Sequence, residues 1–234
     1  MSFGGNGISM DELIFYTALW READEMYDHP NRKVEQEKKS YISEENKAKI
    51  KAISRDVENN LKGIEAEEKI HSYLNPGPFA KVPHYELKNV YLVDCNGMSH
   101  EIDFIEIRET GIFCIEVKNW GGVISGGRQD KYWLSNGNTR RNPCFQNDTH
   151  IRAIHDIIGK KPHITSVIVM AQNNARPLNI EGVINLNDFR SFMSSFTEKV
   201  ISLEDMHRIY ALLEQSRVKM SRKQHVENIK KYGK

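Results

Sequence analysis

The fold is decided by the stretch HEIDFIEIRETGIFCIEVKNW, residues 100–120. Polar and apolar residues alternate from Glu101 to Arg108, and an almost unbroken apolar run follows from Ile112 to Val117. Alternation is typical of a half-buried strand, and the apolar run is typical of a strand that is buried on both faces. The residues between the two runs, 109–111, have the chemistry of a turn. We therefore predict a β-hairpin.

Three charged residues lie at the end of this hairpin away from the turn. Side chains two apart on a strand share a face, so Glu116 and Lys118 lie on the face of Cys114. If the turn has an even number of residues, strand pairing brings Asp103 beside them. An odd turn without a bulge would put Asp103 on the opposite face.

A buried pair of carboxylates indicates a cation. Two carboxylates about 5 Å apart repel by roughly 3 kcal/mol at an effective dielectric constant near 20. Carboxylate oxygens favour the hard ions Mg²⁺ or Mn²⁺, and a lysine beside such an ion can position a water and stabilise charge on a phosphate. The alternative is a surface hairpin with an ordinary cross-strand ion pair.

Composition sets limits on the partners. The 234 residues allow one domain with an appendage, and the net charge of +1 means that any nucleic-acid site has to be local. The three cysteines have no metal-binding spacing, and zinc is not favoured because His150 and His155 do not share a helix face. No apolar stretch has membrane-spanning length and there is no signal-peptide core, so we expect a cytoplasmic protein without a membrane partner.

The first 60 residues are predicted to form a helical arm. A helix is expected from Asp11 until His29-Pro30 breaks it, and Ser43-Glu44 has the features of a second helix start. Residues 31–60 are rich in Lys, Glu and Asn and poor in large apolar residues, which indicates a face turned to solvent or to a partner. A second copy of the chain or another protein is the partner expected for this arm.

The second helix is predicted to continue to Leu74. Its later part places Gly63, Glu67, Ile70 and Leu74 on one face. Glu67 thus points with the apolar stripe, where a carboxylate is costly unless it is paired or binds a metal. The alternative is a glutamate at the edge of the stripe that reaches solvent.

Short strands and turns are predicted on both sides of the central hairpin. The expected strands are residues 82–87, 90–94, 123–124, 132–134, 164–170 and, at an edge, 181–184. Asn96-Gly97 and Asn136-Gly137 are expected tight turns. Asn142-Pro143 reads as the start of a helix that runs to Ile158. Gln146, in the first turn of this helix on its core side, either bonds to backbone or contacts a ligand.

The carboxyl-terminal part is predicted to be a helix followed by a basic tail. Ser202 begins the helix, and Met206, Ile209, Leu212 and Leu213 form its apolar stripe. The residues that follow are basic and suggest either a solvated tail or a contact with the phosphate backbone of nucleic acid. The candidates for that contact are Arg217, Lys219, Arg222 and Lys223.

Four blocks of this sequence, taken in order, resemble the nuclease-related domain (NERD) family, a branch of the PD-(D/E)xK nuclease superfamily. They are GIEAE at residues 63–67, EID at 101–103, GIFCIEVKN at 111–119 and NPCFQ at 142–146. The resemblance covers roughly residues 61–171. The family commonly has Gly-Glu where this chain has Ala66-Glu67, and alanine preserves the helix.

The resemblance implies an α/β fold with a restriction-endonuclease-like core, in which helices flank a mixed central β-sheet. It implies a nuclease core at residues 61–190, after the arm of residues 1–60 and before a C-terminal helix with a basic tail at 191–234. It also implies metal-dependent cleavage of phosphodiester bonds, and DNA is the expected partner.

The family's roles fall on five residues and one carbonyl group. Asp103 and Glu116 would bind Mg²⁺ or Mn²⁺, with the Val117 carbonyl as a further ligand and Glu67 completing the set directly or through water. Lys118 would orient the attacking water, and Gln146 at the start of the next helix would position Lys118 or the water. The alternative is a nuclease-fold module with little turnover that binds nucleic acid, or a partner through its arm.

Overall fold

The computed structural model describes residues 44–75 and 83–233. The chain divides into two units, residues 1–60 and 61–234. In the first unit, the described residues begin helix α3 (Glu44–Leu74), which starts and ends where the sequence predicts. The helix predicted from Asp11 lies outside the described residues.

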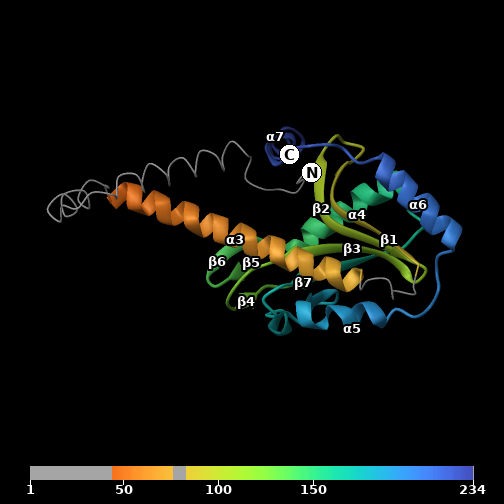
Figure 1. Ribbon diagram of the computed structural model, residues 1–234, viewed down its shortest axis with the longest axis horizontal. Coiled ribbons are helices and arrows are strands. Elements are labelled where there is room, and N and C mark those ends of the chain that lie inside the picture. The colour runs from red at the N-terminus through yellow and green to blue at the C-terminus, as the bar shows by residue number, and fades with distance from the viewer. Residues whose placement is uncertain (1–43, 76–82, 234) are drawn as a thin grey trace, which may run out of the picture. The chain divides into compact units, whose positions relative to one another are not determined.

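The second unit is built on a five-stranded mixed sheet with the order β1-β2-β3-β7-β8 (Figure 1). The first three strands are antiparallel, and β7 and β8 continue from β3 in parallel. This is the mixed α/β architecture that was expected. The strands are β1 (His84–Val93), β2 (Ser99–Arg108), β3 (Gly111–Lys118), β7 (Ile164–Met170) and β8 (Val183–Asn185).

The predicted hairpin is β2 and β3, and its turn is the even one. Arg108 pairs with Gly111 and Ile107 pairs with Ile112, so only Glu109 and Thr110 form the loop. With this register the alternating side chains of β2 meet those of β3 on the expected faces.

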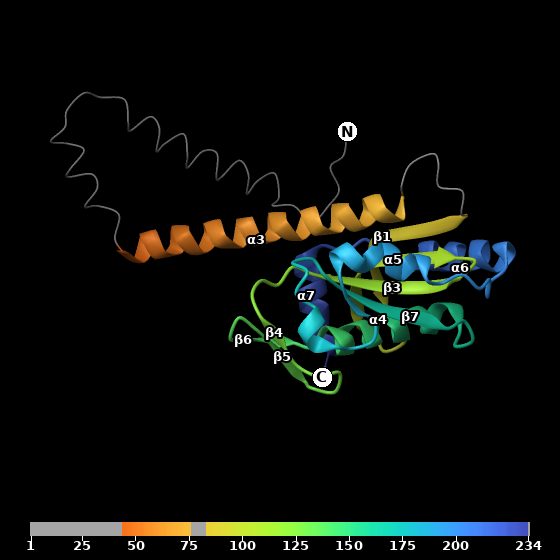
Figure 2. The ribbon, with the colours of Figure 1, turned by 90° about the horizontal axis from the view of Figure 1, so that it is seen from below.

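Helices cover both faces of the sheet (Figure 2). The later part of α3 and α5 (Phe189–Ser194) cover one face, and α4 (Pro143–Ile158) and α6 (Leu203–Gln215) cover the other. The first core contains Ile70, Leu74, Phe104, Phe113, Ile115, Phe189 and Met193. The second core contains Ile105, Ile107, Ile112, Cys114, Ile154, Ile158, Met206, Ile209 and Leu213.

A second, three-stranded sheet lies between β3 and α4 in the chain. It consists of β4 (Ile124–Ser125), β5 (Tyr132–Ser135) and β6 (Asn138–Arg141). The sequence predicted the first two strands and the Asn136-Gly137 turn but not β6. All four residues of β6 are polar and exposed, so hydrophobic periodicity could not reveal this strand.

The strand predictions before the central hairpin need one correction. The expected strands at 82–87 and 90–94 are one strand, β1, whose pairing continues through Lys88 and Val90. Asn89 between them has a φ of 50°. Asparagine tolerates this left-handed conformation, so the apolar pattern is interrupted while the strand remains in the sheet.

The basic tail also needs a correction, because helix α7 (Arg222–Tyr232) lies within it. A capping box between Ser221 and Gln224 begins this helix, and His225 is buried. The boundary predicted at 190/191 falls inside α5, and α6 contributes to the main core. Two short 3₁₀ turns, η1 (Arg176–Leu178) and η2 (Leu186–Asp188), complete the unit.

The three cysteines do not form disulfide bonds. Cys114 and Cys144 are buried, Cys95 is exposed, and all three are free.

Among the helices of residues 44–75 and 83–233, none combines the length and the apolar character needed to cross a bilayer.

Candidate active site

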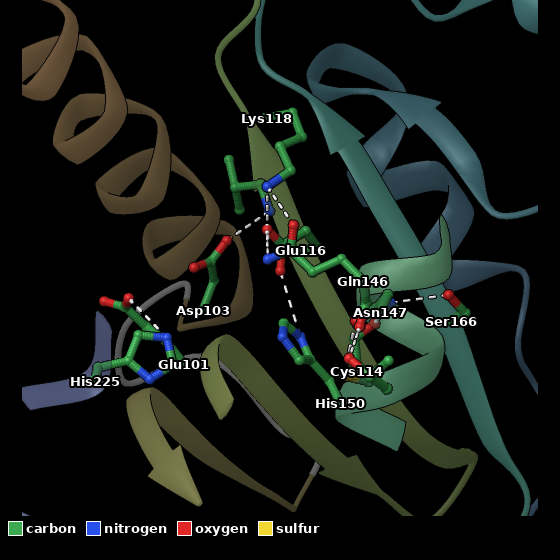
Figure 3. A network of polar contacts seen from close by, with 12 residues as sticks. Glu101, Asp103, Cys114, Glu116, Lys118, Gln146, Asn147, His150, Ser166 and His225 are labelled. Carbon is green, nitrogen blue, oxygen red and sulfur yellow. Dashed lines mark hydrogen bonds and ion pairs between the residues drawn. The ribbon is translucent and has the colours of Figure 1, made fainter. Parts of the chain in front are cut away.

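The site lies in a fork between β2 and β3 (Figure 3). Their pairing stops at Phe104 and Ile115, whereas β2 stays paired with β1 as far as Ser99 and β3 stays paired with β7 as far as Lys118. The Val117 N–H therefore has no main-chain acceptor on β2. It donates instead to Oδ2 of Asp103, at 2.7 Å. The separation of the strands thus gives the Asp103 side chain a place between them.

Beside β3, a closed hydrogen-bonded group is formed by the side chains of Glu116, Lys118 and Gln146. The Lys118 ammonium donates to Oε1 of Glu116 and, at 3.0 Å, to Oε1 of Gln146. The Gln146 amide also donates to Oε1 of Glu116, at 2.9 Å. Each of the three side chains therefore fixes the other two.

The beginning of α4 brings Gln146 to this group. Asn142 caps the helix by accepting a hydrogen bond from the Cys144 N–H at 2.9 Å, and Pro143 occupies the first turn. Asn147 then ties the helix to the sheet, because its amide donates to the Cys114 carbonyl at 2.9 Å and to the Ser166 hydroxyl at 2.8 Å. The position of Gln146 is thus set by a rigid helix start.

The electrostatics of the site couple Asp103, Glu116 and Lys118. Burial, and then the charge of Glu116, raise the pKa of Asp103 well above its usual value, although Lys118 and the Val117 N–H act in the opposite direction. Burial alone would lower the pKa of Lys118, but Glu116 and Asp103 outweigh it, so this pKa is raised. The lysine is therefore protonated at neutral pH, and the two carboxylates repel each other.

Glu67 lies at the border of the site on α3. It is half-buried, and burial is the largest cause of its raised pKa, against a hydrogen bond with Asn89 and the charge of Lys88. Its charge also contributes to the raised pKa of Asp103. Glu67 is thus close enough to act on Asp103 electrostatically. Asn89 is a partner that the sequence did not predict, and its only signal is the break in the strand pattern.

His150 is a second residue of the site to which the sequence analysis gave no role. Its Nδ1 atom lies 3.5 Å from Oε2 of Glu116, and both atoms are buried without a hydrogen-bond partner among the described residues. Burial, followed by the positive fields of His100, Lys118 and other groups, lowers its pKa to about 3. The imidazole is therefore neutral at physiological pH. The sequence feature that could have placed His150 at the site is its spacing of four residues from Gln146, which puts both side chains on one face of α4.

The donor atoms of the site suit a hard divalent cation. In a strand, the N–H and C=O groups of one residue point to the same neighbour, so the Val117 carbonyl faces the fork with the Asp103 carboxylate. The buried Oε2 atom of Glu116 lacks a donor. No three His, Cys, Asp or Glu side chains of the described residues are grouped closely enough to hold a metal. The fitting set is thus two carboxylates and one carbonyl, completed by water, as Mg²⁺ accepts.

The basic residues predicted to contact nucleic acid lie elsewhere. Arg217 forms an ion pair with Glu214 at 3.0 Å, and Lys219, Arg222 and Lys223 are exposed around the start of α7. In the described part of the chain, no hydrogen bond or ion pair joins these four residues to the group in the fork. Their contact with nucleic acid stays a prediction.

Comparisons with known proteins relate the part of the chain that holds this site to one family. Residues 62–171 match the family model described as "Nuclease-related domain", and the matched segment contains all five predicted catalytic residues. The chain is 29% identical over 136 residues to a Bacillus anthracis protein described as uncharacterized. This alignment covers 54% of the chain and 64% of the relative, which is less than two thirds of the relative's length. No solved structure matches with significance.

Proposed function

We propose, from the premise that residues 62–171 belong to the nuclease-related domain family, that this protein is a metal-dependent nuclease acting on DNA. A nuclease-related role follows from the family, and the fork in the sheet supports catalysis. One observation carries this proposal. Asp103 and Glu116, which repel each other, face a lysine that the same group keeps protonated. Folding alone gains little from such an arrangement.

Mg²⁺ or Mn²⁺, when bound, would polarise a phosphate oxygen and make a bound water more acidic. Asp103, Glu116 and the Val117 carbonyl would hold the ion, and Glu67 would contribute through water. These ligands are already oriented by the Val117 N–H and by Gln146.

Lys118 is assigned to the phosphate and the attacking water. Its raised pKa means that it donates hydrogen bonds rather than accepting a proton. An ammonium group in this position orients the water and offsets the negative charge that develops on the phosphate. Gln146 positions Lys118 through the 3.0 Å hydrogen bond.

A cleavage assay tests the proposal. The parent protein, Lys118→Ala and Asp103→Asn are incubated with linear, circular and single-stranded DNA and with RNA, in Mg²⁺, Mn²⁺ or EDTA. We expect the parent to cleave DNA only with metal, and either substitution to reduce the rate by at least about 100-fold. Full metal-dependent cleavage by Asp103→Asn would refute the assignment. A preference for RNA would correct the substrate.

A second candidate is a binding module that uses its arm to hold a partner protein or a second copy of the chain. The observation in its favour is that Ile50 and Ile53 on α3 are 54% and 42% exposed. Light scattering of the parent and of Ile50→Ser/Ile53→Ser tests this candidate. A dimer that becomes a monomer in the variant, together with no cleavage of any substrate, would favour the binding module over the nuclease.

A further inference from the structure

The β5–β6 hairpin is inserted between two elements of the candidate site. Residues 119–123 alone connect Lys118 to β4, and Asn142 alone connects β6 to α4. Lys118 and Gln146, which lie on either side of this insertion in the chain, are hydrogen bonded at 3.0 Å. Both ends of the small sheet are therefore anchored at the fork, and Figure 2 shows the sheet projecting beside the start of α4.

This hairpin is rigidly attached at its base. The Asn142 amide donates to the carbonyl groups of Gly127, Arg128 and Asp130 at 3.2, 3.1 and 2.6 Å. The side chain of Trp133 is fully buried in the core that includes Ile168 and Met170. The β5–β6 hairpin is thus held in a fixed position relative to the fork.

The outer face of the hairpin carries an aromatic ring between two cations. Tyr132 is 52% exposed and pairs with Arg141, so the two side chains share a face, and the Lys131 ammonium lies 5.4 Å from the centre of the tyrosine ring. We call Lys131, Tyr132 and Arg141 the hairpin face.

The charges of this face are not neutralised by neighbouring carboxylates in the described part of the chain. Among the described residues, Lys131 and Arg141 have no acidic ion-pair partner, whereas Arg128, Lys199 and Arg208 are all paired. The neighbouring residue Arg140 is exposed as well. Two unpaired cations around an exposed aromatic ring match the phosphates and bases of a nucleic-acid strand.

The hairpin face is also close to the site along the chain. Only Asn142 separates Arg141, the last residue of β6, from α4, and Gln146 in the first turn of α4 is hydrogen bonded to Lys118 at 3.0 Å. A nucleic-acid strand that places one phosphate at Lys118 would therefore continue past Arg141. Four residues of β6 extend about 13 Å, which is roughly four nucleotides of one strand in B-form DNA.

We propose that the hairpin face binds the nucleic-acid strand beside the scissile phosphate, with Lys131 and Arg141 on phosphates and Tyr132 stacked on a base. This inference rests on the proposed nuclease function and names the surface that holds its substrate. It assigns the contact to a surface other than the four basic residues at 217–223.

Binding without cleavage gives the direct test. Anisotropy of labelled single-stranded and duplex DNA is measured in EDTA for the parent, for Lys131→Gln/Arg141→Gln and for the matched control Lys160→Gln/Lys161→Gln. The control removes two exposed lysines just beyond the opposite end of α4. We expect the hairpin variant to bind at least about tenfold more weakly and its slope of log affinity against log salt to fall by about 1.4 to 1.8.

Stacking is tested separately by Tyr132→Ala and Tyr132→Phe. We expect the alanine variant to lose affinity for single-stranded DNA several-fold, and the phenylalanine variant to bind like the parent because it keeps the ring. Thermal unfolding of each variant checks the fold. A hairpin variant that binds like the parent, or that loses no more than the lysine control, overturns the proposal.

The outcomes separate this inference from the proposed function. If the parent cleaves DNA with metal but the hairpin variant binds normally, only this inference fails. If the parent does not cleave but the hairpin variant loses binding, the surface is supported and the nuclease proposal fails. A further double variant, Lys219→Gln/Lys223→Gln, also removes two positive charges. If it loses more binding than the hairpin variant, the contact belongs to the carboxyl-terminal residues and the inference is wrong.

Discussion

Asp103 is a residue of the candidate site whose ionised form costs folding stability. Its carboxylate is held in the fork by the Val117 N–H, yet burial and the charge of Glu116 raise its pKa. A raised pKa means that the ionised form is less favourable in the folded state than in the unfolded chain. The negative charge of Asp103, where the carboxyl is ionised, therefore destabilises the fold.

Replacing Asp103 by the neutral isostere should stabilise the protein. In EDTA at pH 7, Asp103→Asn is expected to raise the free energy of unfolding by about 1 kcal/mol, or roughly 2–4 °C in Tm, while abolishing cleavage. The gain should shrink as the pH falls through the raised pKa, because the parent carboxyl is then neutral too. Calorimetry at several pH values measures this, with exposed Asp156→Asn as the control. A variant less stable than the parent at pH 7 would contradict the prediction.

His150 should make the fold sensitive to acid. Its pKa of about 3 lies below the usual 6.5, so the unfolded chain binds the proton more readily. The stability that comes from this neutral imidazole is complete above pH 6.5 and is lost as the pH falls toward 3. At 1.36 kcal/mol per unit, the loss reaches roughly 3 kcal/mol by pH 4.

The measurement compares urea unfolding of the parent and of His150→Asn from pH 7.5 to 4. Asparagine keeps an amide near the position of Nδ1 but does not titrate. The free-energy difference between the two proteins should therefore change with pH in favour of the variant below pH 6.5. Parallel pH profiles would show that His150 does not titrate between the folded and unfolded states.

At the scale of elements, the start of α4 holds both the Gln146 amide of the candidate site and the small sheet. Asn142 is fully buried, caps α4 and donates to three carbonyl groups of the loop before β5. Loss of this one side chain should therefore disturb two elements together.

Asn142→Ala is expected to lower the free energy of unfolding by about 2–4 kcal/mol, because a cap is lost and buried carbonyl groups lose their donor. Cleavage should fall as well, since Gln146 follows in the first turn. The matched control is Asn138→Ala in β6, whose exposed amide makes a single long hydrogen bond of 3.4 Å. Chemical denaturation of the two variants measures the difference. Equal effects would mean that the cap contributes little.

At the scale of the whole molecule, the two units are expected to differ in their contribution to stability. All buried apolar residues of the described chain follow residue 60. α7 contributes to the second unit through His225, whose ring lies 2.7 Å from the Ser99 hydroxyl, and through Asn228, which accepts from the Ser99 N–H at 2.7 Å.

Deletion of residues 1–60 should leave a folded, active unit. We expect its Tm within about 3 °C of that of the full chain and its cleavage retained, because the deletion removes no described core residue. Deletion of residues 218–234 is the comparison, and it should lower the Tm because it exposes the start of β2. Circular dichroism follows both transitions. An unfolded 61–234 fragment would show that the arm is part of the fold.

The sequence by itself determined the elements whose signals are local. The period of two in β2, the apolar run of β3, the Asn142-Pro143 helix start and the β-branched strand at 164–170 are all where the sequence predicts them. Strand periodicity and capping chemistry act between near neighbours, so they can be read without the fold. β6 and α7 were missed because their apolar content is too low to give a signal.

Only the tertiary structure decided how the site is assembled. The sequence left the parity of the turn open, and the two-residue loop of Glu109 and Thr110 settled the face of Asp103. The separation of β2 from β3, the neutral state of His150 and the approach of Asn89 to Glu67 depend on groups far apart in the chain. Burial and charge act through space, so the chemistry of these side chains exists only once the sheet and its helices have packed.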